Sequence, residues 1–434
     1  MAHRHRSSIR GVRVSKSSQR LVVLGLGYVG LPLVREATQR GVAVTGFDVS
    51  AAVVGGLNAG RSHVDDISDA DVAAMVAAGF RATSDPSCLD TAEVAVICVP
   101  TPLDEHKAPD LRAVESAART IRDHLRAGML VVLESTSYPG TTDTLVRGIL
   151  EESGLVAGRD FALAFSPERI DPGNPTWNLR NTPKIVGGLT PACTERAAEF
   201  YGAIVDTVVR APGPREAEMA KLLENTYRHI NIALVNEMAV ISHQLGVDLW
   251  AAIDAARTKP FGFAAFYPGP GVGGHCIPID PNYLSHQVRE LGDEFRFVEL
   301  AQEISGRMPA YVVSRVRAQL ARAGVAEASA TVLLLGLTYK ADIADDRETP
   351  SRDVVRELRR AGMRVVGHDP HLSAFDVDGT SLELVGSLTE GLAACHCRTT
   401  ATLHAAFDPQ TIATGAPLVF DTRGRLHGPN VERL

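Results

Sequence analysis

The stretch LVVLGLGYVGLPLVREATQRGVAVTGFD, residues 21–48, has the pattern of an apolar strand, a glycine turn, a helix and a second strand. Gly25, Gly27 and Gly30 follow the first strand, and Asp48 ends the second. Glycines at this spacing allow a tight turn and a close approach of the backbone to a pyrophosphate, and the acid accepts hydrogen bonds from a ribose. The stretch predicts a dinucleotide site, and Asp48 favours NAD over NADP. A glycine turn that serves helix packing only is the alternative. The predicted loop also contains Tyr28 and Val29.

The same alternation of apolar strands and helices continues along the chain. Residues 94–99 and 130–133 are strand-like, and residues 111–125 have the pattern of a helix between them. Continuous apolar strands that alternate with helices indicate a parallel, doubly wound sheet. We therefore expect an α/β domain that ends near residue 210.

A long helix is predicted after this domain. Residues 215–246 contain no proline and no internal glycine, and residues 230–241 are apolar on nearly every face. A helix that is apolar all round must be buried, and one that bridges two domains can also supply a dimer interface. The pattern predicts burial of residues 230–241 and favours a homodimer or a larger homo-oligomer.

A second α/β unit begins at Thr331. TVLLLGLTYK has the pattern of a strand and loop, SRDVVRELRRAG that of a helix, and MRVVGHDP that of a strand ending at Asp369. This unit carries no GxGxxG motif, so we expect it to hold something other than a dinucleotide. The predicted fold class is α/β, with two Rossmann-like doubly wound domains joined by a long central helix.

Composition excludes several classes of function. The chain has 434 residues and a net charge of −7, which argues against a protein that coats nucleic acid. No run approaches the roughly 18 apolar residues of a membrane span, so we expect no membrane partner. The six cysteines are sparse and show no disulfide framework, which favours a cytoplasmic location. Residues 1–20 are basic without an apolar core and predict a disordered extension.

Metal binding has one weak candidate in the sequence, the run Cys395, His396 and Cys397. Ligands this close together lack a second pair at the spacing of a zinc finger. We therefore predict no metal site.

The loop GPGVGGHCIPIDP, residues 269–281, places one cysteine among glycines, with an aspartate four positions later. A structural cysteine usually lies in an apolar run, whereas the surroundings of Cys276 suit a thiol that a reactant must approach. An inert thiol buried in a tight loop is the alternative. Lys221 and Asn225 lie four residues apart on the predicted long helix and can point together into a cleft. A solvated pair is the simpler interpretation of these two residues.

Two further groups are candidates for substrate binding. Lys340 and Arg347, in the loop after the first strand of the second unit, can grip a phosphate, or Arg347 can pair with acids of its own loop. Phe263, Phe266 and Tyr267 precede the cysteine loop. These rings suit the face of a sugar or base, or an ordinary satellite core.

Several motifs occur in a consistent order over residues 20–430, namely GLGYVGLPL, VPTPL, ESTSYPGTT, SPERIDPGN, AKLLENTYR, GVGGHCIPIDP and YKADIADDRETPS. With these motifs the chain resembles the nucleotide-sugar 6-dehydrogenases of the UDP-glucose/GDP-mannose dehydrogenase family. It looks most like the branch that acts on UDP-N-acetylglucosamine or its galacto epimer. The resemblance implies an NAD-binding domain at 21–210, a central dimerisation and catalytic-loop segment at 211–310, and a UDP-sugar-binding domain at 311–434.

The resemblance also implies a reaction, the four-electron oxidation of a sugar C6 alcohol to a carboxylate with two NAD⁺ and no metal. Cys276 would add as a thiolate to the aldehyde, and oxidation of the thiohemiacetal would give a thioester. Lys221 and Asn225 would stabilise charge on the C6 oxygen, and Asp280 or Glu168 would position or deprotonate the hydrolytic water. The other site residues implied by motif match are Thr101 and Thr136 for the cofactor, Thr136 also beside the catalytic residues, and Arg169 and Gly273 for the substrate.

Several positions depart from the family pattern. UDP-glucose enzymes usually have a lysine at the position of Ile279 and an acid at that of Pro172, so both residues favour the N-acetylhexosamine branch. The basic residue that often follows the position of Asp48 is absent. Ser305 with Gly306, and Gly424, replace the residues usual in that branch. These last changes are compatible with neutral drift or with an altered sugar.

Alternative functions share parts of this pattern. The same chemistry on UDP-glucose, UDP-N-acetylmannosamine or an unusual nucleotide sugar uses the same residues. A two-electron β-hydroxyacid-type dehydrogenase would not need Cys276 or the second unit. A non-catalytic sensor of NAD or nucleotide sugars would keep the fold without needing the thiol. The leading hypothesis is a UDP-N-acetylhexosamine 6-dehydrogenase that supplies a glycan or a small sugar metabolite.

Overall fold

The structure, a computed structural model, describes residues 19–104, 108–171, 173–274, 277–414 and 417–434. Contacts divide the chain into two compact units. The first comprises the described residues up to Thr101 together with Leu111–Glu218, and the second comprises Pro102–Asp110 and Met219–Leu434. This division falls inside a single helix, and the domain boundaries predicted at 210 and 310 remain predictions.

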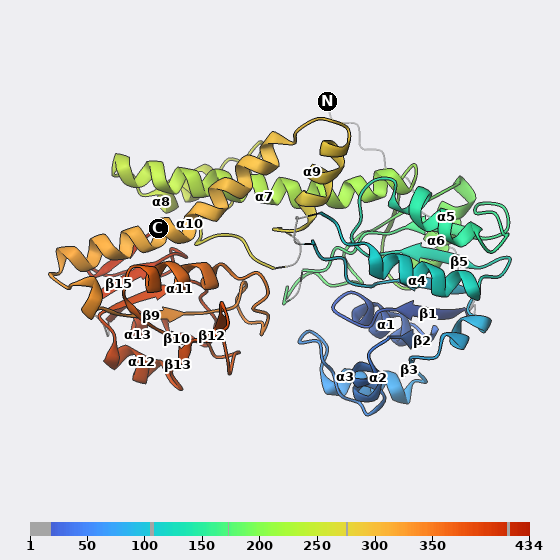
Figure 1. The fold of residues 1–434 in the computed structure, drawn as a ribbon, viewed down its shortest axis with the longest axis horizontal. Helices are drawn as coiled ribbons and strands as arrows, with labels where there is room; N and C mark the ends of the chain where they lie inside the picture. Colours follow the sequence, from blue (N-terminus) through green and yellow to red (C-terminus); the bar gives the residue numbers. More distant parts are fainter. Residues whose placement is uncertain (1–18, 105–107, 172, 275–276, 415–416) are drawn as a thin grey trace. The chain divides into compact units, whose positions relative to one another are not determined.

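The first unit contains an eight-stranded sheet in the order β3-β2-β1-β4-β5-β6-β7-β8 (Figure 1). Its neighbouring strands are parallel except for β6 and β7, which are antiparallel. The strand order reverses between β1 and β4, so a ligand crevice is expected at the carboxyl ends of these strands. The strands are β1 (Arg20–Leu24), β2 (Ala43–Phe47), β3 (Arg81–Thr83), β4 (Val94–Ile97), β5 (Leu130–Leu133), β6 (Ala162–Phe165), β7 (Lys184–Gly188) and β8 (Val208–Arg210).

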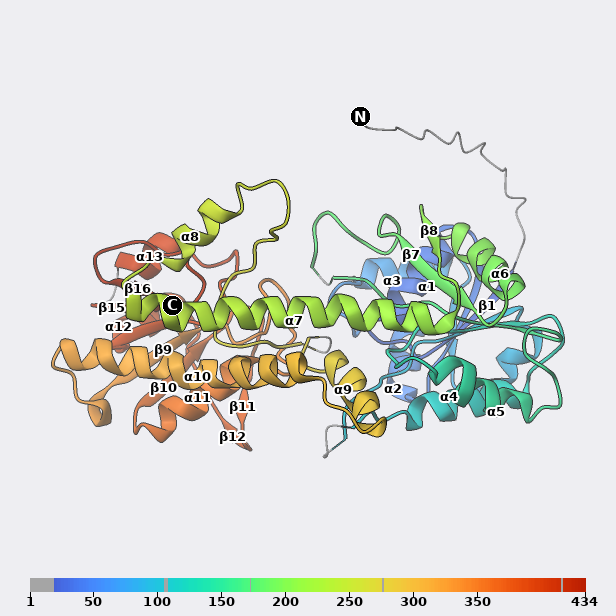
Figure 2. The ribbon, with the colours of Figure 1, turned by 90° about the horizontal axis from the view of Figure 1, so that it is seen from above.

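Helices cover both faces of this sheet (Figure 2). Side chains from α1, α3 and α6 join one buried cluster, and the buried side chains of α4 and α5 lie outside it on the other face. The helical elements are α1 (Gly30–Gln39), α2 (Ala51–Asn58), α3 (Asp69–Ala77), η1 (Pro86–Thr91), α4 (Arg112–Asp123), η2 (Thr141–Val146), α5 (Arg147–Glu151) and α6 (Pro191–Gly202).

The second unit contains a parallel six-stranded sheet in the order β13-β10-β9-β14-β15-β16, besides the short hairpin β11-β12. Along β9, Val332 and Leu334 join the cluster on one face, while Leu333 and Leu335 join the cluster on the other. This alternation buries both faces. The strands are β9 (Thr331–Leu335), β10 (Arg364–His368), β11 (Asp376–Val377), β12 (Thr380–Ser381), β13 (Glu383–Leu384), β14 (Cys397–Thr400), β15 (Leu418–Asp421) and β16 (Val431–Arg433).

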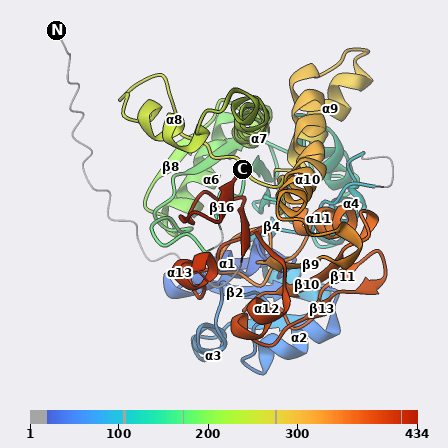
Figure 3. The ribbon, with the colours of Figure 1, turned by 90° about the vertical axis from the view of Figure 1, so that its left-hand side faces the viewer.

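Figure 3 shows α10 and α11 on one side of this second sheet and α12 on the other. Among the described residues, no helix is long and apolar enough to cross a membrane. The remaining helical elements are α7 (Pro214–Leu245), α8 (Leu249–Ala256), α9 (Asp280–Glu290), α10 (Arg296–Arg322), η3 (Glu327–Ser329), α11 (Pro350–Arg360), α12 (Leu388–Ala394) and α13 (Pro409–Thr414).

The predicted fold class, with two Rossmann-like α/β sheets and a long helix between them in the sequence, is confirmed. The strand predicted at 130–133 is present with the same bounds, and the helices predicted at 111–125 and 215–246 are present with small shifts at their ends. The strand predicted to end at Asp369 ends one residue earlier, because Asp369 instead accepts hydrogen bonds from the backbone.

The prediction that residues 230–241 are buried on nearly every face is wrong for the single chain. One side of α7 packs beside α10 in the second unit, where Ala239 shares a cluster with Met308 and Val312 (Figure 2). In the described residues the opposite side is exposed over much of its length, because a helix packed against one neighbour buries only one stripe. Its exposed apolar residues, named here the apolar stripe of α7, are Met219, Leu223, Tyr227, Leu234, Met238, Ile241 and Leu245.

The first sheet begins with a tight turn that positions an acid. Gly25 follows β1 with φ +92°, a conformation that favours glycine. A Cβ on Gly25 would lie 2.6 Å from the carbonyl oxygen of Cys98. The next amide, Leu26 N–H, donates to Asp48 Oδ2 at 3.0 Å.

The second sheet repeats this turn. Gly336 follows β9 with φ +75°, and a Cβ there would lie 1.9 Å from the carbonyl oxygen of Thr402. Leu337 N–H donates to Asp369 Oδ2 at 2.6 Å. Unlike Asp48, Asp369 also accepts a hydrogen bond from His404 Nε2 at 3.0 Å. Burial opposes ionisation of Asp369, but its hydrogen bonds lower its pKa to about 2.

Candidate active site

The glycine loop after β1 leaves the space that a dinucleotide requires. A Cβ on Gly30 would lie 1.9 Å from the Gly25 carbonyl oxygen, so the third glycine lets α1 begin directly against the turn. A Cβ on Gly27 would meet no heavy atom of the described residues within 4 Å. Asp48 is half-buried beside this loop. An open second glycine and a neighbouring acid fit the pyrophosphate and ribose of NAD.

The other predicted cofactor residues also lie in the first unit. Tyr28 and Val29 are partly buried against its core cluster. Thr101 and Thr136 are half-buried, and each follows a central strand of the sheet by a few residues. These positions place all four residues on the carboxyl-end side of the sheet, where doubly wound folds bind nucleotides.

The loop that carries Thr136 is anchored by a residue that the sequence analysis did not single out. Glu218, at the start of α7, is fully buried and accepts backbone hydrogen bonds from Gly140 at 2.8 Å and Thr142 at 2.9 Å. The Thr142 hydroxyl and the Ser137 hydroxyl donate to the same carboxyl group. Burial raises the pKa of Glu218 to about 7, although these hydrogen bonds oppose the shift. The anchor fixes the turn that precedes η2.

Glu168 lies in the first unit just after β6 and is 8% exposed. Its Oε1 accepts hydrogen bonds from the amides of Arg169 at 2.6 Å and Ile170 at 2.5 Å. Its Oε2 lies 3.5 Å from Lys184 Nζ. Arg169 donates from Nη1 to the Pro183 carbonyl at 2.7 Å. Glu168 is therefore held at both oxygens.

In the second unit the structure brings Lys221, Asn225 and Asp280 together. Lys221 and Asn225 lie one turn apart on α7, and Asp280 opens α9. Asn225 Nδ2 donates to Asp280 Oδ2 at 2.5 Å, and Lys221 Nζ lies 4.0 Å from the same oxygen. All three are buried. Burial raises the pKa of Asp280 to about 6, although Lys221 and Asn225 oppose the shift. A carboxylate with this pKa is suited to accept a proton near neutral pH.

Gly273 and Gly274 pack against the loop that follows β9. A Cβ on Gly273 would lie 2.6 Å from the Glu348 carbonyl oxygen, and one on Gly274 would lie 2.7 Å from the ring of Tyr339. Close packing therefore requires glycine at both positions. The predicted nucleophile Cys276 lies outside the described residues.

A pocket of about 1310 Å³ lies in the second unit beside the loops that follow β9, β14 and β15. The strand order reverses between β9 and β14, which is where a doubly wound sheet binds its ligand. Lys340 lines the pocket, together with Arg423 and Arg425, which the sequence analysis did not identify. Burial lowers the pKa of Arg423 to about 10, so it stays charged at neutral pH. These groups suit an anionic ligand.

Arg347 forms the ion pair that the sequence left open as the alternative to phosphate binding. Its Nε and Nη2 donate to the two carboxylate oxygens of Asp345, at 2.8 and 2.5 Å. Its carbonyl accepts a hydrogen bond from Gly274 N–H at 3.2 Å. Arg347 thus braces the loop after β9 against the glycine loop.

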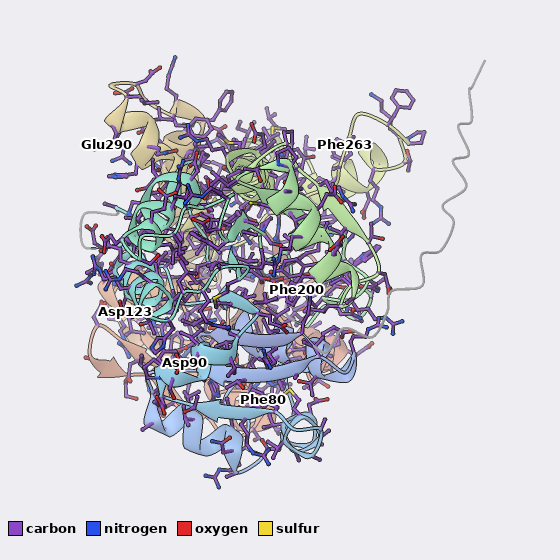
Figure 4. The ribbon with its side chains drawn as sticks, turned by 90° about the vertical axis from the view of Figure 1, so that its right-hand side faces the viewer. Phe80, Asp90, Asp123, Phe200, Phe263 and Glu290 are labelled. Atoms are coloured by element: carbon purple, nitrogen blue, oxygen red, sulfur yellow. The ribbon has the colours of Figure 1, made fainter. Side chains whose placement is uncertain are left out.

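The predicted aromatic group separates into different environments. Phe266 packs edge-on against Tyr227, with ring centroids 5.7 Å apart. Tyr267 stacks on Trp250 at 5.6 Å, and both line the pocket of the second unit. Phe263 is 43% exposed and stands out from the loop after α8 (Figure 4).

Trp250 gives a physical reason for Gly424. Gly424 has φ +63°, and a Cβ there would lie 2.3 Å from Trp250 Cδ2. The indole is fixed by its stack on Tyr267 and by a hydrogen bond from Nε1 to the Leu434 carbonyl at 2.8 Å. A larger residue at 424 therefore requires the indole to move. Nothing in the structure explains Gly306, where a Cβ would meet no heavy atom of the described residues within 4 Å.

Gly424→Asn is expected to lower the free energy of unfolding by about 1 to 3 kcal/mol, because it overpacks the Trp250 contact. The same substitution in a Trp250→Ala background is expected to cost much less, because the indole is gone. Denaturant unfolding of the four proteins in this cycle measures the coupling. An equal cost in both backgrounds would contradict the contact.

His404, in a group of described side chains that could ligate a metal, already has protein partners at both ring nitrogens. Asp342, His371 and His404 lie close together. However, His404 Nδ1 accepts the amide hydrogen of Asp342 at 2.9 Å, and its Nε2 bonds to Asp369. In the run Cys395, His396 and Cys397, burial raises the pKa of Cys397 to about 12, which disfavours the thiolate that a metal needs.

Comparisons with known proteins agree with these two nucleotide-type units. Three models of the UDP-glucose/GDP-mannose dehydrogenase family match in order: its NAD binding domain at residues 19–205, its central domain at 215–306 and its UDP binding domain at 333–428. The chain is 38% identical over 360 residues to the UDP-N-acetyl-D-glucosamine 6-dehydrogenase of Pseudomonas aeruginosa, with 82% of this chain and 84% of that protein covered.

Other relatives carry different substrate names. The UDP-N-acetyl-D-mannosamine dehydrogenase of Pyrococcus horikoshii is 36% identical, with 81% of this chain and 84% of that protein covered. The solved UDP-D-ManNAc dehydrogenase of Pyrococcus horikoshii has a TM-score of 0.87 at 32% identity, covering 96% of this chain and 99% of that one. A UDP-glucose dehydrogenase from Pyrobaculum islandicum has a TM-score of 0.84 at 28% identity, covering 98% of each chain.

Proposed function

Because the chain belongs to the UDP-glucose/GDP-mannose dehydrogenase family, we propose that it oxidises the C6 alcohol of a UDP-N-acetylhexosamine to a carboxylate. It is an NAD-dependent UDP-sugar dehydrogenase, and its cofactor is NAD. UDP-N-acetylglucosamine is the first substrate to test, since the relative that is 38% identical is named for it. UDP-N-acetylmannosamine comes next, since another relative is named for that sugar.

The observation that carries the proposal is the buried contact of Lys221 and Asn225 with Asp280. Because Lys221 and Asn225 are buried, the interpretation of these two residues as a solvated pair does not apply. Burying an ammonium beside a carboxylate costs free energy, so the arrangement needs another explanation. An ammonium and an amide can stabilise negative charge on the C6 oxygen, while an adjacent carboxylate accepts a proton. This combination suits oxidation of an alcohol followed by hydrolysis.

The proposed reaction proceeds through Cys276. NAD, when bound, accepts a hydride in each of the two oxidations. The thiolate of Cys276 adds to C6 of the aldehyde, and loss of hydride from the resulting thiohemiacetal leaves a thioester. Water then attacks the thioester carbonyl, Asp280 or Glu168 takes the proton, and the thiolate departs from the new carboxylate. Gly27 and Asp48 would hold the pyrophosphate and ribose of the cofactor.

The proposal includes a homodimer that covers the apolar stripe of α7. Several large apolar side chains lie exposed along one side of this helix, including Leu223, which is 63% exposed, and Leu245, which is 71% exposed. Contiguous exposed apolar surface of this kind marks an interaction site. The pocket beside Lys340 would receive the UDP moiety, since its arginines suit a diphosphate.

The test is the number of NADH molecules formed per sugar consumed, measured by absorbance with UDP-N-acetylglucosamine, UDP-N-acetylgalactosamine, UDP-N-acetylmannosamine and UDP-glucose separately. We expect two NADH per sugar with an N-acetylhexosamine. Cys276→Ser is expected to abolish acid formation and to keep substrate binding. A ratio of one in the unmodified enzyme would overturn the thioester route. No turnover of any of the four sugars would instead favour an unusual sugar or a sensor.

A further inference from the structure

The loop that follows β5 in the first unit is fixed at both ends, and Thr136 lies between them. At its start, Ser135 Oγ donates to the Val99 carbonyl at 2.8 Å, and the Ser135 amide donates to the Ile97 carbonyl at 3.1 Å. Ser135 is 3% exposed. These bonds tie the start of the loop to the end of β4, the neighbouring strand in the sheet.

The residue before Ser135 adds a buried ion pair to this start. Glu134 Oε2 lies 3.1 Å from Lys184 Nζ, and the hydroxyl of Tyr201 donates to Glu134 Oε1. The side chains of Glu134 and Lys184 are both buried. Glu134 comes directly after β5, Lys184 opens β7 and Tyr201 lies on α6. Three elements of the first unit therefore hold this point of the loop.

The far end of the loop has a single carboxyl group as its anchor. Glu218 Oε1 accepts hydrogen bonds from the Thr142 amide at 2.9 Å, the Thr142 hydroxyl at 2.7 Å and the Ser137 hydroxyl at 3.2 Å. Glu218 Oε2 accepts a hydrogen bond from the Gly140 amide at 2.8 Å. Glu218 and Ser137 are buried, whereas Thr136 is half-buried. Thr136 is thus the more accessible residue between two fixed serines.

The anchor requires the ionised form of Glu218, because all four groups that meet its carboxyl are donors. A carboxylate only accepts hydrogen bonds, and a backbone amide only donates them. The proton of a neutral carboxyl would face an amide of Gly140 or Thr142, or would force a hydroxyl to turn round, so at least one of the four bonds is lost. Burial raises the pKa of Glu218 to about 7, although the hydrogen bonds oppose the shift. The anchor therefore changes its charge near neutral pH.

The elements around Glu218 carry few other charges. Arg215 Nε donates to Asp143 Oδ2 at 2.7 Å and joins the first turn of α7 to η2, with the Arg215 side chain 59% exposed. β7 meets this turn at Gly187, where a Cβ would lie 3.0 Å from Ala217 Cβ. The other charged or titratable groups on the loop, β7 and the first two turns of α7 are Glu134, Tyr138, Lys184, Glu216 and Lys221.

We propose that the Glu218 carboxylate is a positioning group that holds the loop after β5 in the form that binds NAD, and that its protonation releases the loop and weakens cofactor binding. Doubly wound folds bind nucleotides at the carboxyl ends of their strands, where Thr136 lies. Glu218 does not touch the cofactor and acts through the loop that carries Thr136. The proposal goes beyond the proposed function, since it concerns the cofactor and no step on the sugar.

The first test is calorimetric titration of the full unmodified chain with NAD, without sugar, at pH 6 and pH 8.5. With a pKa of about 7, Glu218 is mostly neutral at the lower pH and mostly ionised at the higher one. Because only the ionised fraction would bind well, we expect the Kd for NAD to be about five to ten times higher at pH 6. An equal Kd at the two pH values would overturn the proposal.

Glu218→Gln imitates the neutral carboxyl without changing its size. We expect this variant to bind NAD at pH 8.5 about as weakly as the unmodified protein does at pH 6, and to have the same Kd at both pH values. A purely structural role of Glu218 would not remove the pH dependence. A dependence that persists in Glu218→Gln would belong to another group, such as Glu134, and would overturn the proposal.

Thr136→Val tests whether the anchor acts through Thr136. We expect Glu218→Gln to weaken NAD binding about fivefold or more at pH 8.5 in the otherwise unmodified protein, and less than about twofold in the Thr136→Val protein. The second effect is smaller because the contact that the loop positions is already gone. Equal effects in the two backgrounds would show that Glu218 does not position Thr136 and would overturn the proposal.

Arg215→Gln is the matched control, because it removes the exposed ion pair with Asp143 and keeps the buried anchor between the same two elements. We expect its Kd for NAD to match that of the unmodified protein at both pH values. The same loss as in Glu218→Gln would assign the effect to the general docking of α7 on η2 and overturn the role of Glu218. The proposed function is judged separately, by the NADH formed per sugar. If the unmodified enzyme yields two NADH per sugar and Glu218→Gln binds NAD normally, only the inference on Glu218 fails.

Discussion

Asp280→Asn is expected to slow turnover at least 100-fold and, at pH 8, to raise the free energy of unfolding by about 3 kcal/mol. Both effects follow from burial, which raises the pKa of this carboxyl to about 6. The folded enzyme binds the proton of Asp280 more tightly than the unfolded chain does. The contribution of Asp280 to stability is therefore full below its unfolded pKa near 4 and is lost as pH rises through about 6. Asparagine imitates the neutral form and avoids this loss, but it cannot accept the proton of water.

Urea unfolding of both proteins at pH 4 and pH 8, together with steady-state NADH formation, measures the two effects. We expect Asp280→Asn to be more stable than the unmodified protein at pH 8, and we expect this difference to shrink at pH 4. Asp369→Asn is the matched control, for which we expect the opposite change in the free energy of unfolding, because hydrogen bonds lower the pKa of that buried carboxyl to about 2. Its substitution is expected to destabilise the enzyme above pH 4. Loss of stability at pH 8 in Asp280→Asn would show that Lys221 and Asn225 outweigh burial.

Gly27→Ala is expected to weaken NAD binding at least tenfold without changing thermal stability, whereas Gly30→Ala is expected to disrupt the first unit. The difference lies in what each new methyl group meets. At Gly27 it meets no heavy atom of the described residues within 4 Å, so it intrudes only on a bound pyrophosphate. At Gly30 it would lie 1.9 Å from the Gly25 carbonyl oxygen, which cannot move without opening the turn.

Calorimetric titration with NAD and thermal unfolding followed by circular dichroism separate the two outcomes. Gly56→Ala serves as the control, because the nearest heavy atom to its new methyl group lies 3.8 Å away. It is expected to bind NAD like the unmodified protein. Normal NAD affinity in Gly27→Ala would mean that the cofactor does not approach the loop at its second glycine.

The features that the sequence predicted are those that depend on local constraints. The glycine loop with Asp48 was recognisable because the spacing of its glycines, and the acid that ends the next strand, can be read directly from one short stretch of sequence. Lys221 and Asn225 were recognisable as neighbours because one helical turn separates them. The burial predicted for residues 230–241 was wrong because hydrophobicity alone does not say how many sides of a helix find partners within one chain.

The features that the sequence missed depend on strand order and on pairwise fit. Lys184, Glu134 and Tyr201 come from separate segments and meet only because β5, β6 and β7 are neighbours in the sheet. The antiparallel placement of β7 has no marker in its five residues. The contact of Trp250 with Gly424 depends on how two segments far apart in the sequence pack together. The sequence alone therefore gave no reason for Gly424.

The same turn occurs once in each sheet, but the aspartates beside the two turns have different partners. Leu26 and Leu337 present their amides to an aspartate in the same way, so the two turns have a common geometry. Asp48 keeps capacity for a ribose, whereas Asp369 is already committed to His404. The two turns thus differ in one hydrogen bond, the one that Asp369 accepts from His404. Asp369 therefore has less capacity than Asp48 to accept hydrogen bonds from a ribose, although the two turns have the same geometry.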